Sequence, residues 1–440
     1  MGCAAGKTSA VDDKEPGPQV FSPGLRHPSS DANFRVELSG KASDPLVETL
    51  STLRTRVGAT LNGATKPPSG PSLQPVLEEY IPVLLGLTKL ESLDTAVNLG
   101  WTNHLARDSA TELRSAKYEL VSILQVMAVA FVEDAGRALQ TQGDKEVGLA
   151  EMKAAFAALL KAAGILQQSI GSVLPNEMDV HARTNLPADV TPGALKALFR
   201  QCLAQAAELQ LQLDRSKEDV PPATRRDVAC EAVVHWGEAR ESMATVSTGG
   251  PLFEKWLAYV KWRQTLAKAV AYHQEGLILD EKEDKGTHGK AVKALKTAEE
   301  LLKESEAFLK EFSEKQPATM PVTASPLIKD LRERLPKDSG KIGRFNTNVY
   351  YEKEPDDPPE LPKPSFTIKP EPYTLPEIDR AWGSSSSGDS GGSHAVRPPI
   401  TETEVPLSVS GQGEMSKPSS KVEAAPEVRV ETKTEAVAAS

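Results

Sequence analysis

Cysteine is scarce in this 440-residue chain, which contains only Cys3, Cys202 and Cys230. Three cysteines so far apart do not form a disulfide framework, so we expect a protein of a reducing compartment. Aromatic residues make up only 5% of the chain, and no apolar run is long enough to predict a membrane-spanning helix. The first residues also lack the charged and apolar segments of a secretory signal peptide, so we expect none.

Positive charge is not in excess either. The formal net charge is −10 at pH 7, which disfavours general nucleic-acid binding and attachment to anionic lipid by charge alone. The seven histidines include no pair at metal-ligand spacing, and Gly6-Lys7-Thr8 lacks the glycine, strand and helix of a phosphate loop. His235 and His273 lie in helical patterns, which favour packing or surface roles over general-base roles. We therefore expect no catalytic residue, cofactor, metal or small-molecule substrate.

The opening residues Met1-Gly2-Cys3 are typical of a lipid-anchored protein. Removal of Met1 would expose Gly2 for N-myristoylation, and the adjacent Cys3 is placed for S-palmitoylation. Two acyl chains hold a protein on a bilayer stably, whereas one myristoyl chain binds only marginally. The match is imperfect, because the pattern favours Ser or Thr where this chain has Gly6. The alternative is an unmodified N-terminus in which Cys3 is incidental.

The chain divides by composition into three parts. Residues 1–32 are rich in Gly, Pro, Ser and Asp and predict a flexible tether. Residues 33–382 carry helical periodicity and predict a mainly α domain. Residues 383–440 have too few apolar residues to fold and predict a disordered tail.

Within the middle part, apolar residues recur at helical spacing. The predicted helices cover 44–64, 73–85 with Ser72 as N-cap, 109–140, 145–173, 191–215, 221–246, 251–281, 289–312 and 326–335. Almost no strand pattern is found before residue 340. Residues 251–281 carry bulky side chains and residues 289–312 carry small ones, which is the pattern of the two helices of a tetratricopeptide repeat. The sequence has no regular repeat period, so we expect an irregular helical solenoid. After Gly340 the chain is Pro-rich, and its interleaved apolar residues predict an extended arm packed along the helices.

Several short segments are similar to segments of the BRO-domain proteins, the ALIX- and BROX-like scaffolds of endosomal sorting. Residues 255–261 and 269–276 resemble the family's long helix with spaced aromatic residues. Residues 346–351 resemble its N-x-x-[IV]-Y segment, and residues 371–373 resemble its closing extended arm. The matches keep the family's order over 34–382, and the BROX-like branch fits best.

This resemblance implies a boomerang-shaped, non-enzymatic helical domain with a tetratricopeptide-like core and a small N-terminal sheet. It also implies an apolar patch that binds the C-terminal amphipathic helix of an ESCRT-III subunit, a helix-in-groove mode of recognition. BROX-like relatives can end in a prenylated cysteine motif, which residues 437–440 lack, so we expect the anchor at the N-terminus instead.

The resemblance places the partner groove on two helices, over 205–215 and 222–236, at Gln210, Leu211, Leu213, Thr224 and Val228. Gln210 and Thr224 are polar at positions where the family has apolar residues. Each lost anchor would weaken binding by about 1–3 kcal/mol. Ordinary helix packing is the alternative role for the three aliphatic residues.

The sequence therefore predicts a lipid-anchored adaptor that links the cytosolic face of the endosomal or plasma membrane to an ESCRT-III-type helix, with a cytoplasmic pool. The alternative is a membrane-associated helical scaffold that has lost ESCRT-III binding and serves a cytoskeletal or signalling partner. No nucleic-acid partner is expected.

Overall fold

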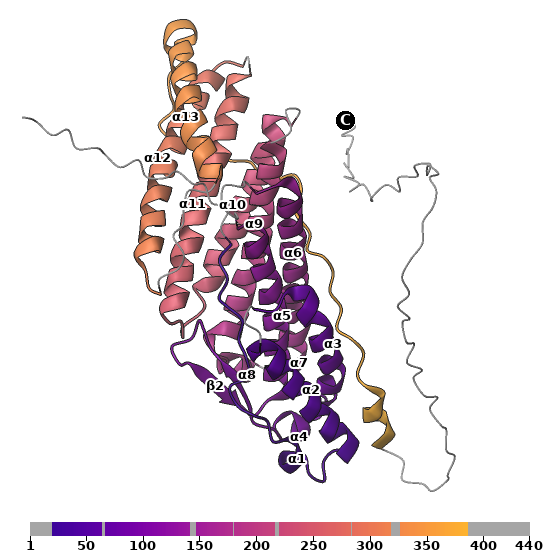
Figure 1. Ribbon diagram of the computed structural model, residues 1–440. Coiled ribbons are helices and arrows are strands. Elements are labelled where there is room, and N and C mark those ends of the chain that lie inside the picture. Colours follow the sequence, from indigo (N-terminus) through magenta and orange to yellow (C-terminus); the bar gives the residue numbers. More distant parts are fainter. Residues whose placement is uncertain are drawn as a thin grey trace, which may run out of the picture. The chain divides into compact units, whose positions relative to one another are not determined.

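Long helices dominate the computed structural model, which describes residues 20–63, 67–140, 147–178, 180–215, 220–282, 284–317 and 326–385 (Figure 1). The elements of the first half are α1 (Phe34–Glu37), α2 (Asp44–Asn62), α3 (Gly70–Leu87), α4 (Glu91–Asp94), β1 (Leu99–Thr102), β2 (Ala110–Leu113), α5 (Ala116–Ala138), α6 (Leu149–Gln168), η1 (Ser169–Val173), α7 (Leu174–Glu177) and α8 (Val180–Thr184). The second half contains η2 (Ala188–Val190), α9 (Pro192–Arg215), α10 (Pro222–Met243), α11 (Pro251–Asp280), α12 (Thr287–Glu314), α13 (Pro326–Phe345), η3 (Asn346–Tyr350) and η4 (Arg380–Ser385).

The long helices pack against one another in chain order. α2 contacts α3, α3 contacts α5, and the series continues through α6, α9, α10, α11, α12 and α13. Each inner helix therefore packs between its predecessor and its successor, which is how a helical solenoid builds a continuous core. The mainly α fold class is confirmed. None of the helices in the described ranges is both long and apolar enough to cross a bilayer.

Proline opens several of the long helices where the sequence predicts it. Pro192, Pro222 and Pro251 each take the first position of a helix, where the missing N–H costs nothing. Thr191 caps α9, because its hydroxyl accepts a hydrogen bond from the N–H of Ala194 at 3.2 Å. The starts of α9, α10 and α11 therefore follow from local sequence.

One predicted helix begins in the wrong place. The helix expected from 109 begins at Ala116, after its N-cap Ser115, because residues 110–113 form strand β2. This strand pairs antiparallel with β1, which places Trp101 opposite Thr111. Three successive residues of β1 are buried, so the alternation that signals a strand is absent from the sequence.

Two further boundaries differ from the prediction. The N-cap of α3 is Ser69, not Ser72, because the Ser69 hydroxyl accepts a hydrogen bond from the Ser72 N–H at 3.3 Å. The last long helix, α13, runs on to Phe345 instead of ending near 335. Its buried face continues through Leu335 and Ile342 at helical spacing, so packing extends the helix.

Residues 20–32 differ from the predicted flexible tether. Phe21 is 6% exposed and Arg26 is fully buried. The Arg26 guanidinium donates to the hydroxyl of Tyr118 at 2.9 Å and to the carbonyl of Thr102 at 2.7 Å. The tether prediction is wrong for these residues, because an aromatic ring and a guanidinium both find buried partners.

The C-terminal arm runs along the helices as an extended chain from 351 to 379 (Figure 1). Three of its N–H groups donate to the helices at 3.0 Å each, from Ile368 to Oε1 of Glu231 on α10, from Glu371 to the carbonyl of Leu160 on α6, and from Asp379 to the carbonyl of Pro82 on α3. The arm thus joins helices that are far apart in the series.

Candidate partner-binding site

The five predicted groove residues lie on α9 and α10, which pack directly against each other. Leu211, Leu213 and Val228 are only 7%, 8% and 2% exposed. Gln210 is half-buried, and Thr224 is exposed. The aliphatic side chains therefore take part in packing within the domain, and the two polar side chains are the members that reach the surface.

The two polar members are held by local contacts. Nε2 of Gln210 donates to Oδ1 of Asp214, one turn later on α9, at 2.9 Å. Thr224 lies in the first turn of α10, where its N–H donates to the carbonyl of Pro221 at 3.0 Å. A helix lying on this surface would meet an amide and a hydroxyl where the resemblance implies apolar anchors.

Leu211 lines a small pocket of about 90 Å³ between α9, α10, α11 and α13. Gln210, Leu213, Thr224 and Val228 do not line it. The other walls include Pro222 and Arg225 of α10, Val270, His273 and Leu277 of α11, and Leu327, Arg334 and Asp338 of α13. Pockets for drug-sized ligands hold about 300 Å³ or more, so this pocket has room for a single inserted side chain.

Polar contacts fix α13 at the rim of this pocket. Nε2 of His273 lies 2.8 Å from Oδ2 of Asp338, which joins α11 to α13. Arg334 pairs with Asp330 on α13 itself, at 2.8 Å. The pocket therefore combines an apolar floor with a charged rim, a composition suited to an apolar side chain with polar neighbours.

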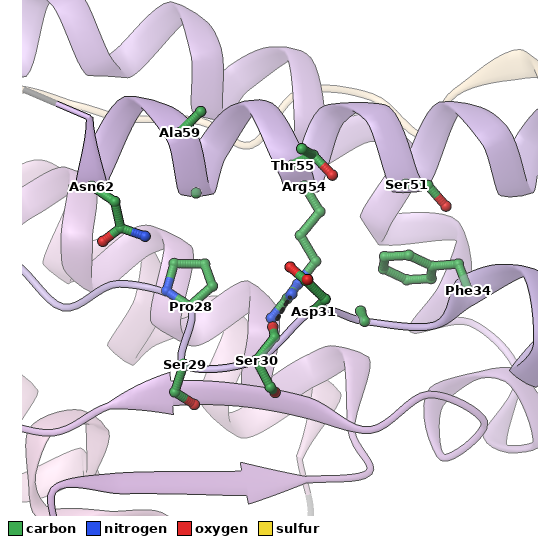
Figure 2. Close-up of a pocket in the computed structure, with 12 residues that line it drawn as sticks. Pro28, Ser29, Ser30, Asp31, Phe34, Ser51, Arg54, Thr55, Ala59 and Asn62 are labelled. Atoms are coloured by element: carbon green, nitrogen blue, oxygen red, sulfur yellow. Dashed lines mark hydrogen bonds between the residues drawn. The ribbon is translucent and has the colours of Figure 1, made fainter.

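A larger hollow of about 550 Å³ lies between α2 and the extended residues that precede it. Figure 2 shows small and polar side chains around it, with Arg54 reaching across toward Ser30. The guanidinium donates to Oε1 of Glu119 at 2.9 Å, to the carbonyl of Ser30 at 2.8 Å and to the carbonyl of Gly100 at 3.3 Å. With these donors committed to the protein, Arg54 is a structural crosslink and not an anion ligand.

Two buried ion pairs were not predicted from the sequence. Arg54 pairs with Glu119, and Arg263 pairs with Glu208. Glu119 also accepts a hydrogen bond from Nε1 of Trp101 at 2.6 Å. The signal that could have revealed them is a charged residue within an otherwise apolar helical segment, as Glu119 is in α5.

Metal and thiol chemistry receive no support within the described part of the chain, where no cluster of three His, Cys, Asp or Glu residues could hold a metal ion. Burial raises the pKa of the Cys202 thiol, and it raises the pKa of Cys230 to about 11. Both thiols are therefore protonated near neutral pH and unreactive. The predicted lipidation sites, Gly2 and Cys3, lie outside the described residues.

Known proteins share this architecture. Residues 39–385 match the BRO1-like domain. The chain belongs to the BRO1-like domain family. Its relatives include the BRO1 domain-containing protein BROX of Danio rerio, which is 25% identical over 355 residues that cover 77% of this chain and 82% of the relative. The vacuolar protein-sorting protein BRO1 of Gibberella zeae is 32% identical over 153 residues, which cover 34% of this chain and only 14% of the relative.

Solved BRO1 structures have the same fold. The ALIX BRO1 domain in its CHMP4C complex matches with a TM-score of 0.59 at 16% identity, over 81% of this chain and 96% of that chain. ALIX in complex with the SIVmac239 PYKEVTEDL late domain matches with a TM-score of 0.59 at 17% identity, over 82% of this chain and 50% of that chain. The predicted BRO-domain membership of this chain is confirmed.

Proposed function

We propose that this BRO1-domain chain is a non-enzymatic adaptor that binds an amphipathic helix of the ESCRT-III type in endosomal sorting. The observation that carries the proposal is the family match over 39–385, and the fold shared with the ALIX BRO1 domain of the CHMP4C complex supports it. A BRO1 domain would bring its partner to a membrane and perform no chemistry itself.

The partner helix would lie across α9 and α10, over Gln210 and Thr224. One apolar side chain would enter the pocket of about 90 Å³ beside Leu211, where a well-packed anchor gives most of the binding energy. Arg225 and Asp338 at the rim would contact polar residues that flank this anchor.

We also propose that acyl chains on Gly2 and Cys3 hold the chain on the cytosolic face of the endosomal or plasma membrane. Because Phe21 is buried in the domain, the tether between anchor and domain has fewer than 20 residues. At about 3.3–3.6 Å per residue it spans at most roughly 65 Å, so the domain would remain close to the bilayer.

A binding titration with a labelled C-terminal helix of an ESCRT-III subunit tests the site. Replacing the polar residues by apolar ones, in Gln210→Phe and Thr224→Leu, should tighten binding roughly fivefold or more for each change. Thr224→Asp should weaken it. Thr49→Leu, an exposed threonine on α2, is the matched control and should leave the affinity unchanged. Indifference of the affinity to all these changes would refute the proposed site.

The polar character of Gln210 and Thr224 favours one second candidate, a scaffold whose helical surface serves a different partner. The same titration separates the two. If the unaltered chain does not bind the ESCRT-III helix while the double variant does, the surface has the family geometry but has changed its partner.

A further inference from the structure

The C-terminal end of α13 and the turn after it expose a cluster of apolar side chains. Phe345, Val349, Tyr350 and Tyr351 are 49%, 56%, 45% and 78% exposed. The sequence predicted that the first three would pack against the helices as part of the arm. No other stretch of seven described residues exposes more than one large hydrophobic side chain. We call this stretch, 345–351, the apolar tip.

The turn of the apolar tip is held by local hydrogen bonds and one ring contact. Tyr351 has a φ of 56°, a left-handed conformation that is unfavourable for a residue other than glycine. Its N–H donates to the carbonyl of Asn346 at 2.7 Å, and the Asn346 amide donates to the carbonyl of Glu352 at 2.9 Å. The Tyr350 ring stacks on His288, with ring centroids 3.5 Å apart. These contacts fix the turn in a form that leaves the Tyr351 side chain in solvent.

Cations surround the apolar tip. Lys337, Lys341 and Arg344 are exposed at helical spacing along α13, and Lys353 is exposed just after the turn. None of these four cations forms an ion pair with a residue of the described ranges. They are therefore available to an external anion.

Three of the carboxylates near the apolar tip are engaged with the domain, whereas Asp356 and Asp357, further along the arm, are exposed. Glu352 accepts hydrogen bonds from two backbone N–H groups at the start of α12, which lower the pKa of its carboxyl group. Asp338 faces His273, and Glu354 pairs with Lys296 at 2.7 Å. Lys341 and Arg344 thus flank the apolar tip without a paired carboxylate among the described residues, although the whole chain carries a net charge of −10.

We infer that the apolar tip and its cations are a contact site for an anionic membrane surface. Aromatic rings favour the headgroup level of a bilayer, and each Lys or Arg near an anionic leaflet strengthens the attraction to it. α13 and the turn between α11 and α12 reach the same end of the helical series, at the top of Figure 1. The tip is therefore placed to meet a flat surface first.

The charges of the chain determine the distance at which the apolar tip and its cations can bind a bilayer. At physiological salt, exposed charges are screened beyond about 8 Å, so the net negative charge of the chain does not repel a distant anionic bilayer and the cations near the tip do not attract it from a distance. The cations act only once the tip touches the headgroups. The site would therefore orient a domain that is already near a membrane, and it does not depend on acylation.

Vesicle sedimentation of the full-length chain, produced without N-terminal acylation, tests the inference. Binding is expected to phosphatidylcholine vesicles containing about 30% phosphatidylserine, and it should weaken as salt rises. Lys341→Glu with Arg344→Glu should reduce binding at least tenfold, and Phe345→Ser with Tyr351→Ser should also reduce it. The control Lys153→Glu with Lys303→Glu changes the net charge equally at exposed positions elsewhere and should have little effect.

Two outcomes would overturn the inference. The first is no sedimentation of the unaltered chain with phosphatidylserine vesicles at low salt, which would favour an acidic protein surface as the partner. The second is an equal loss of binding in the control variant. Binding of the ESCRT-III helix is measured on the same variants, so that failure of the membrane contact is distinguished from failure of the adaptor function.

Discussion

The ring of Phe21 lies parallel to the indole of Trp256, with centroids 6.1 Å apart and planes 2° apart. The Phe21 carbonyl accepts a hydrogen bond from Nε2 of Gln201 at 2.7 Å. The first described residues are therefore tied to α9 and α11, although the chain next enters α1 and α2 at the other end of the series. This attachment fixes the point at which the N-terminal segment leaves the domain.

Phe21→Ala should lower the free energy of unfolding by about 3–5 kcal/mol, because it leaves a cavity among the rings of α11 and α12. Urea unfolding followed by tryptophan fluorescence measures the change. Val36→Ala, at a side chain that is 69% exposed, is the control and should shift stability by less than about 0.5 kcal/mol. A loss below about 1 kcal/mol for Phe21→Ala would show that the ring is not part of the core.

The same glycine-to-alanine change should have opposite effects at two helical positions. A Cβ on Gly164 would overlap the carbonyl oxygen of Glu371 in the arm, whereas a Cβ on Gly58 would meet no atom within 4 Å. We expect Gly58→Ala to stabilise the chain by about 0.5–1 kcal/mol through helix propensity. Gly164→Ala should destabilise it by about 1–3 kcal/mol through overpacking.

Displacement of the arm gives a second readout for Gly164→Ala. Chymotrypsin should cleave after Phe366 and Tyr373 faster in this variant, because the hydrogen bond from the Glu371 N–H to Leu160 holds the arm on α6. Gly58→Ala should leave the cleavage rate unchanged. Equal rates for both variants would contradict the close packing of the arm at Gly164.

Arg54 and Arg56 provide a matched comparison on one helix, since each pairs with a glutamate. The Arg54–Glu119 pair is buried, and the Arg56–Glu79 pair is more than half exposed. Arg54→Met should cost about 3–5 kcal/mol, because it leaves a buried carboxylate without its partner. Arg56→Met should cost less than about 1 kcal/mol. Thermal unfolding of both variants measures the difference, and similar costs would argue against the buried network.

Helices were predictable from the sequence where local signals and packing agree. α9 carries both a capping Thr191 and an apolar stripe, so its bounds were predicted closely. The burial of Phe21 was not predictable, because a single aromatic residue in a stretch rich in Gly and Pro has no periodicity. Its ring partners, Trp256 and Tyr259, lie more than 200 residues away, and only tertiary packing brings them together.

The candidate groove shows a different limit of prediction from sequence. Leu211 and Leu213 lie on α9 and Val228 lies on α10, and an aliphatic residue type in a helix does not reveal whether its side chain meets a partner or a neighbouring helix. The structure places them inside the domain. Val228→Asp would therefore bury a carboxylate and test folding, whereas the exposed Thr224 tests partner binding without disturbing the core.

The proposed acyl anchors make a graded prediction for membrane fractionation in cells. Gly2→Ala removes the site of myristoylation and should release the chain into the soluble fraction. Cys3→Ser leaves one myristoyl chain, which binds only marginally, so its distribution should be intermediate. Ser9→Ala, a nearby change outside the motif, should behave like the unaltered chain. If both Gly2→Ala and Cys3→Ser stay on membranes like the unaltered chain, the acyl anchor is wrong and the lipid contact at 345–351 becomes the stronger explanation of membrane binding.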